Sequence, residues 1–161
     1  MIGIVIVTHR QLGKALIEAA ESVLGDPPDA VISVSVNPGA DTDMLRKKIG
    51  KGIRAVNRKK GVLIFTDMFD GTPANLSYSF LREGAVDIIS SVNLPILLKA
   101  ITSRKKMSFA SLTQCLEAYG RRNISLASGV LKGQSRSSAS FCPFEVTLGQ
   151  QREMAAENGL N

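Results

Sequence analysis

The sequence predicts an α/β protein with a doubly wound, mostly parallel sheet, and three observations support this prediction. Short runs of apolar, β-branched residues alternate four times with segments whose apolar residues recur every three or four positions. Gly, Pro, Asn and Asp separate most of these segments. The chain of 161 residues is long enough to bury one core. Such alternation is typical of a parallel sheet with helices on both faces.

The first two strand–helix pairs occupy the first third of the chain. Residues 2–7 are short, apolar and β-branched, as in a strand buried on both faces. Residues 12–24 have one apolar helical face, and Gly25 is a suitable C-terminal stop. Residues 30–36 predict the second strand, and Asp41 is a candidate cap for the next helix. That helix has an apolar face of Met44, Leu45, Ile49, Ile53 and Val56.

The third strand–helix pair has the clearest helix start and stop residues. Residues 61–67 predict a strand, and residues 71–84 predict a helix. Thr72 is expected at the N-cap, Pro73 at the first helical position and Gly84 after the end.

The remaining elements are shorter or less regular. Residues 86–93 predict the fourth strand, and helices are expected at 94–101 and 108–119, the second stopped by Gly120. Residues 123–131 are a candidate last strand.

A strand order of 2-1-3-4, the flavodoxin-like topology, makes the first and third strands neighbours. The strand order then reverses between them, and ligands of such sheets bind outside the carboxyl ends of the strands at this reversal. His9 follows the first strand, and Asp67 ends the third. We therefore expect one crevice to contain His9, Asp67 and the amino end of the Thr72 helix.

His9 is the single histidine and the candidate catalytic residue. A lone histidine is more often structural, but a carboxylate in this crevice can hold one ring nitrogen and leave the other free to attack. Asp67 is expected to fix the tautomer and to stabilise the cation. The alternative for Asp67 is a loop carboxylate that caps a turn.

The segment "DMFDGTPAN" (67–75) predicts a phosphate site beside His9. A helix beginning at Thr72 directs free backbone N–H groups at an anion, and the Thr72 hydroxyl and Asn75 amide add hydrogen-bonding groups. Gly71 allows close backbone approach. An ordinary capped helix is the plain alternative. Together these parts predict a phosphorylatable histidine, and without a Gly-rich nucleotide loop or a metal-ligand cluster we expect no cofactor and no metal.

The positive charge does not predict nucleic-acid binding. Lys and Arg number 20 against 14 acids, giving +6, but aromatic residues are only 5% and Trp is absent. Stacking residues do not interleave with the basic runs, so we interpret the runs as solvated surface or a protein-docking face. The runs are 46–48, 58–60, 104–106 and 121–122.

The sequence shows no membrane-spanning or secretion signal. No apolar run approaches the roughly 20 residues of a membrane helix. The start, "MIGIVIVTHRQ", lacks the basic region and cleavage site of a signal peptide. Cytoplasmic localisation is the expectation.

Three segments resemble a known family. "GIVIVTHRQLGKALIEAAESVLG", "GVLIFTDMFDGTPANLSYSFL" and "VNLPILLKAI" are similar to the IIA domain of the mannose-type (mannose/fructose/sorbose) phosphotransferase system. The resemblance covers about residues 1–133 and carries the family's specific signature, a strand-end His with D-x-[FW]-G-G-[ST]-P-x-N after the third strand. Residues 134–161 match nothing familiar and are expected to be an extension of unknown role.

The resemblance implies a phosphohistidine carrier. His9 would accept a phosphoryl group from the phosphocarrier HPr and pass it to a IIB component, with membrane components IIC and IID involved only indirectly. Asp67 matches the family's histidine partner, and Thr72 matches its phosphate side. The family forms homodimers by exchanging a carboxyl-terminal antiparallel edge strand, for which residues 123–131 are the matching segment.

The sequence departs from the family pattern at Asp70, where the family usually has Gly. Asp tolerates left-handed backbone, so the turn is expected to survive, but its charge repels a phosphoryl group. No IIB sequence accompanies this domain, so a free-standing IIA is expected. A regulatory protein of the same fold that signals phosphorylation state is the alternative. A weaker alternative is that the chain is related to the phosphotransfer subunit of dihydroxyacetone kinase, whose corresponding loop lacks the G-T-P helix start seen here.

Overall fold

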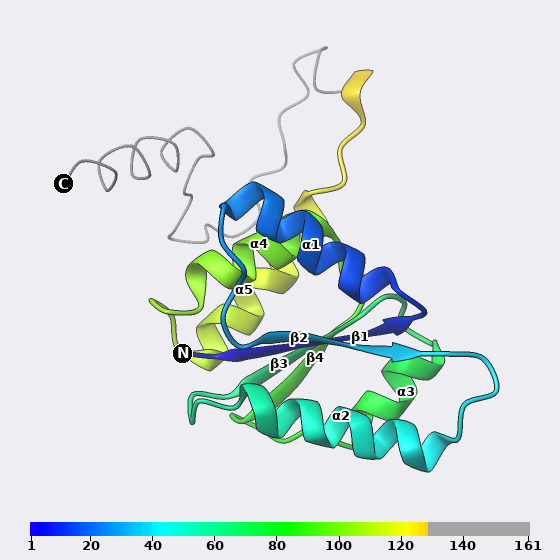
Figure 1. The fold of residues 1–161 in the computed structure, drawn as a ribbon. Helices are drawn as coiled ribbons and strands as arrows, with labels where there is room; N and C mark the ends of the chain where they lie inside the picture. Colours follow the sequence, from blue (N-terminus) through cyan, green and yellow to red (C-terminus); the bar gives the residue numbers. More distant parts are fainter. Residues whose placement is uncertain (129–161) are drawn as a thin grey trace.

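The computed structural model describes residues 1–128 as a four-stranded sheet between two layers of helices (Figure 1). All neighbouring strands pair in parallel, in the order β2-β1-β3-β4. The predicted doubly wound sheet of order 2-1-3-4 is therefore confirmed. The strands are β1 (Gly3–His9), β2 (Val31–Val36), β3 (Val62–Thr66) and β4 (Val86–Ile89).

Helices cover both faces of the sheet. α1 (Leu12–Leu24), α4 (Leu94–Ser103) and α5 (Phe109–Arg122) lie on one face, and α2 (Thr42–Val56) and α3 (Thr72–Tyr78) lie on the other (Figure 1). Two hydrophobic clusters result, because alternate residues of a strand point to opposite faces. Ile4 and Ile6 of β1 join the α1/α4/α5 layer, whereas Val5 and Val7 join the α2/α3 layer.

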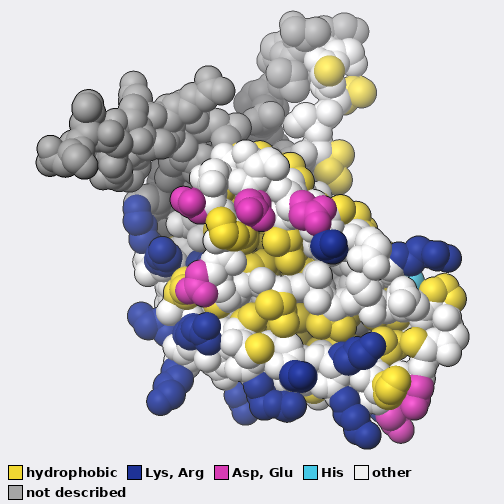
Figure 2. Space-filling view, in the orientation of Figure 1, with side chains coloured by type: hydrophobic (Ala, Val, Ile, Leu, Met, Phe, Trp, Pro, Cys, Tyr) yellow, Lys and Arg dark blue, Asp and Glu magenta, His cyan; other side chains and the backbone are white. Residues whose placement is uncertain are grey.

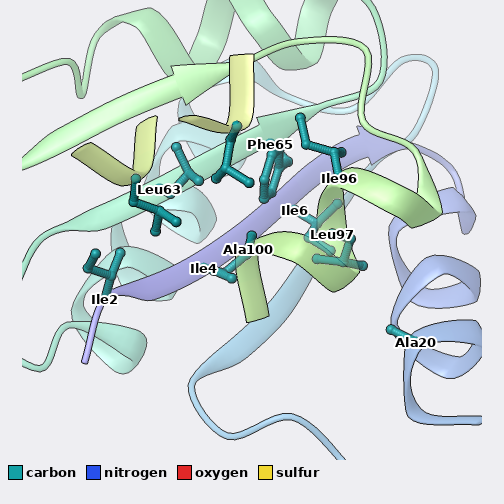
Figure 3. Close-up of a cluster of buried hydrophobic side chains, with 11 residues drawn as sticks. Ile2, Ile4, Ile6, Ala20, Leu63, Phe65, Ile96, Leu97 and Ala100 are labelled. Atoms are coloured by element: carbon teal, nitrogen blue, oxygen red, sulfur yellow. The ribbon is translucent and has the colours of Figure 1, made fainter. Parts of the chain in front are cut away.

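The α1/α4/α5 layer contains the larger side chains. Leu63 and Phe65 of β3 point the same way as the β1 isoleucines and pack with Leu97 and Ala100 of α4 (Figure 3). All four of these residues have 0% exposed surface. This continuous packing fixes β1 and β3 side by side, and their carboxyl ends carry the site described below.

The predicted helix caps of α1 and α2 are confirmed. Gly25 ends α1 in the left-handed region with φ of 86°. The Asp41 side chain accepts a hydrogen bond of 2.8 Å from the backbone N–H of Asp43 at the start of α2.

Two predicted helix ends are wrong. The helix expected over 71–84 ends at Tyr78, because the backbone N–H groups of Phe80 and Leu81 bond to carbonyls three residues back in a tighter turn. Gly120 lies within α5 and does not stop it. A Cβ at Gly120 would lie 3.0 Å from Ile96 Cδ1, so this glycine permits the close approach of α5 and α4.

The predicted edge strand over 123–131 is not formed in its described part. Residues 124–126 have no regular structure, and residues 127–128 are helical. Its expected hydrogen-bonding partner was the edge of another subunit, so a single chain offers it no strand to pair with. Residues 129–131 and the predicted extension 134–161 lie outside the described residues. Nowhere in residues 1–128 is a helix both long and apolar enough to cross a membrane.

Candidate active site

The site lies where the strand order reverses. β1 pairs with β3 on one side and with β2 on the other, so the chain leaves the sheet in opposite directions from β1 and β3. His9 is the last residue of β1, and Asp67 directly follows β3. Parallel strands end at the same edge, which brings these two residues together across 58 positions of sequence.

Asp67 holds His9 through one oxygen. Asp67 Oδ2 accepts a hydrogen bond of 2.8 Å from the His9 backbone N–H and lies 2.9 Å from His9 Nδ1. The other oxygen, Oδ1, accepts from the backbone N–H of Met68 at 3.1 Å. An ionised carboxylate only accepts hydrogen bonds, so this arrangement assigns the ring proton to Nδ1 and leaves a lone pair on Nε2.

The two side chains differ in their access to solvent. The His9 side chain is 42% exposed, whereas that of Asp67 is 12% exposed. None of the hydrogen bonds found within residues 1–128 involves Nε2. A half-buried ring with one nitrogen held by a carboxylate and the other without a hydrogen bond can act as a nucleophile toward an incoming group.

Gly71 packs against the histidine ring. A Cβ at this position would lie 3.2 Å from His9 Cε1 and 2.8 Å from Met68 Cγ. Its φ of −85° is open to any residue, so the constraint is the space that a side chain would need. The backbone thus approaches the ring at Gly71.

The remaining predicted site residues are near in sequence but make no described contact with His9. Gly71, not Thr72, is the N-cap of α3, and its missing side chain leaves the first turn without a side-chain cap. Thr72 and Asn75 are both exposed on α3. Asp70 is exposed too, and it is not among the residues with positive φ, so its turn needs no left-handed residue.

Two neighbours of His9 were not singled out from the sequence. Arg10 has φ of 51°, an uncommon conformation for a residue other than glycine, and its backbone N–H bonds to Val36 O at 3.0 Å. The buried Thr8 hydroxyl accepts a bond of 2.8 Å from the Gly13 N–H and so fixes the start of α1 beside the end of β1. The sequence indicates both residues only indirectly, because they lie where a predicted strand is followed at once by a helix.

A second feature lies beside the outer edge of β4. It is a groove of about 590 Å³ between β4 and α5, and neither His9 nor Asp67 lines it. Among residues 1–128, no cluster of three or more His, Cys, Asp or Glu could hold a metal ion.

The fold and the His9–Asp67 pair define a flavodoxin-like α/β protein with a histidine-centred site at the switch point. The family model described as "PTS system fructose IIA component" matches residues 3–116. The fructose-specific EIIA component of Bacillus subtilis is 29% identical over 129 residues, which cover 80% of this chain and 88% of that protein. The sorbose-specific EIIA component of Lacticaseibacillus casei is 32% identical over 114 residues, which cover 70% and 81%.

A solved structure shows the same fold. The crystal structure of phosphotransferase system component EIIA from Streptococcus agalactiae superposes with a TM-score of 0.71 and 23% identity, covering 80% of this chain and 98% of that one. The chain belongs to the mannose-type family of IIA components of the sugar phosphotransferase system.

Proposed function

We propose that this chain is a phosphohistidine carrier that accepts a phosphoryl group from phospho-HPr on His9 and passes it to a IIB component. The observation that carries the proposal is the bond between His9 Nδ1 and Asp67 Oδ2, 2.9 Å long, at the switch point of the sheet. It leaves the exposed ring with one nucleophilic nitrogen, as a transfer site requires.

The transfer is an exchange of one N–P bond for another. His9 Nε2 attacks the phosphorus of the donor's phosphohistidine, the donor's N–P bond breaks, and its electron pair returns to the donor imidazole. The His9 ring gains positive character, which the Asp67 carboxylate stabilises through the Nδ1–H bond. Transfer to IIB repeats this step with His9 as the leaving group, so no water and no net proton are consumed.

The residues after Asp67 are proposed to hold the phosphoryl oxygens. Gly71 brings backbone close to the ring. The exposed Thr72 hydroxyl and Asn75 amide lie on the first turns of α3 and can turn toward an oxyanion.

Exposed apolar side chains support a protein donor and a protein acceptor. Leu12, Met68 and Phe69 are 45%, 54% and 66% exposed. Leu12 begins α1 just after His9, and Met68 and Phe69 follow Asp67, so all three stand in the segments that carry the site. Apolar surface around a reactive residue is typical of a docking surface for another protein.

We also propose a homodimer formed through residues 123–133. β4 is an edge strand, and the groove of about 590 Å³ beside it is lined by residues of β4 and α5. Ile124 and Leu126 are 85% and 76% exposed and follow α5 directly. Addition of this segment to the partner's β4 would pair open backbone groups and cover apolar side chains. A full-length protein that is entirely monomeric by light scattering contradicts this proposal.

A two-stage transfer assay tests the proposed function. The protein is first incubated with phosphoenolpyruvate, enzyme I and HPr, and then purified and mixed with the IIB component of a fructose or sorbose system. We expect one acid-labile phosphate in the first stage and its loss to IIB in the second. A stable phosphate that no IIB removes contradicts the carrier role and favours the regulatory alternative.

A further inference from the structure

The chain's excess positive charge is concentrated on α2 and the turn that follows it. Residues 41–60 contain eight Lys or Arg and two Asp, so their net charge of +6 equals that of the whole chain. The rest of the sequence is therefore balanced. All eight cationic side chains are exposed. Figure 2 shows Lys and Arg gathered along the lower surface of the molecule, over α2.

Three of these cations form a stripe along the outward side of α2. Lys47, Lys51 and Arg54 are spaced by four and three positions, the spacing of one helix face, and Arg58 follows the end of the helix. The opposite side of α2 packs on the sheet. Fifteen residues of helix are about 22 Å long, so this basic stripe presents a straight row of charges on the outermost layer of that side of the molecule (Figure 1).

Within residues 1–128, no carboxylate forms an ion pair with the basic stripe. Of the eight cations, Arg46 alone reaches a carboxylate within the described part of the chain, Asp43 at 3.9 Å. Like charges at these spacings destabilise a helix. The helix dipole favours cations in the last turn, such as Arg54, but not Lys47 and Lys51 in the middle. Nothing in the fold therefore requires the two central lysines.

We propose that the basic stripe binds the anionic phospholipid headgroups of a membrane surface. A flat lipid surface needs only that several cations project together beyond their surroundings, and each contributes additively to binding. Nucleic acid is the less suitable partner, because residues 41–60 contain no aromatic side chain on which bases could stack.

A protein bound to the membrane through α2 keeps its phosphotransfer site accessible. The strands run along α2, and their carboxyl ends, where His9 lies, open at the end of the molecule and not through the α2 face (Figure 1). A carrier held by α2 therefore presents His9 sideways, parallel to the membrane, to its protein partners. The binding depends on α2 alone and does not require phosphate on His9.

Vesicle binding of the full chain tests the proposal. The protein is mixed with phosphatidylcholine vesicles with and without phosphatidylglycerol, at low and high salt, and the bound fraction is measured by sedimentation. We expect binding only with phosphatidylglycerol, and weaker binding at high salt. Each cation near an anionic surface changes affinity about fivefold, so the triple variant Lys47→Gln, Lys51→Gln, Arg54→Gln should lose about a hundredfold.

A triple variant of equal charge is the matched control. Lys14→Gln, Arg82→Gln, Lys105→Gln removes the same charge from exposed positions outside residues 41–60. It should lose far less affinity than the stripe variant, and both should keep the thermal stability of the native protein and its rate of phosphorylation by HPr. Equal losses in both variants, or no binding to phosphatidylglycerol vesicles, overturns the proposal. Tighter binding to duplex DNA than to vesicles at the same salt also overturns it, in favour of nucleic acid.

Discussion

Asp67 Oδ2 accepts hydrogen bonds from two donors of the same residue, the backbone N–H and the ring Nδ1 of His9, at 2.8 and 2.9 Å. The carboxylate thus fixes the ring relative to its own backbone. The result is a partly exposed ring with a defined tautomer, whose Nε2 makes no hydrogen bond found within residues 1–128.

The variant Asp67→Asn should keep the fold and slow phosphorylation of His9 by at least about tenfold. An amide oxygen can still accept from the backbone, but it lacks the charge that strengthens the Nδ1–H bond, and 1.4 kcal/mol of lost stabilisation is tenfold in rate. Quench-flow measurement of transfer from phospho-HPr tests this. Asp26→Asn, in the exposed loop after α1, is the control. An unchanged rate in Asp67→Asn removes Asp67 from the mechanism.

The variant Gly71→Ala should slow transfer through contact with the ring. The new Cβ would lie 3.2 Å from His9 Cε1, and the ring cannot withdraw without losing its bond to Asp67. We expect a several-fold slower rate at unchanged thermal stability, because φ of −85° suits alanine.

The double variant Gly71→Ala, Met68→Ala separates the two contacts of this Cβ. Because Met68 also belongs to the proposed docking surface, the double variant is compared with Met68→Ala alone. Met68 is 54% exposed, so its side chain can move away, and Gly71→Ala should slow transfer in the Met68→Ala background as well. Equal rates of the double variant and Met68→Ala assign the effect to Met68 and contradict the role of Gly71 beside His9.

Asp70→Gly should shift the phosphate equilibrium from HPr toward this protein. Asp70 adds a negative charge to the loop that begins at Asp67, and this charge repels a phosphoryl group on His9. Because Asp70 is exposed, solvent and salt screen the repulsion, and we expect a shift of less than about tenfold that is larger at low salt. Equal equilibrium constants for the two proteins at low ionic strength show that Asp70 only shapes the turn.

Arg104→Met should destabilise the fold by about 2–4 kcal/mol, because it leaves buried carbonyls without their donor. Arg104 is 3% exposed and donates to the backbone carbonyls of Ile2, Asp29 and Ala30. Burial lowers the pKa of its guanidinium, partly offset by Asp29, but the group stays charged at neutral pH. Urea unfolding measures the effect, with the exposed neighbour Lys105→Met as control. Equal stabilities of the two variants contradict this account of Arg104.

The sequence predicts the sheet and the His9–Asp67 pair because both follow from local pattern. Apolar strands alternating with helices imply a parallel sheet, and parallel strands end together, so two polar residues at neighbouring strand ends meet. Arg104 illustrates what pattern does not reveal. It stands in a run of three cations that reads as surface, yet it reaches Ile2, 102 positions away, and only the packed fold brings the two together.

Helix ends depend on similar long-range contacts. Gly120 is a residue type that commonly ends helices. It lies inside α5, however, where Ile96 of α4 packs closely against it. α3 ends early because the backbone after Tyr78 forms a tight turn, a choice that propensity alone does not decide. The left-handed backbone of Arg10 likewise accompanies a bond to β2 and is not indicated by its residue type.

The site of phosphorylation tests the central claim most directly. Native protein and the His9→Ala variant are incubated with phosphoenolpyruvate, enzyme I and HPr, and phosphate on the chain is measured by intact mass before and after brief acid treatment. We predict one acid-labile phosphate on the native protein and none on His9→Ala, whose fold is checked by circular dichroism. A phosphate that persists on His9→Ala contradicts the account.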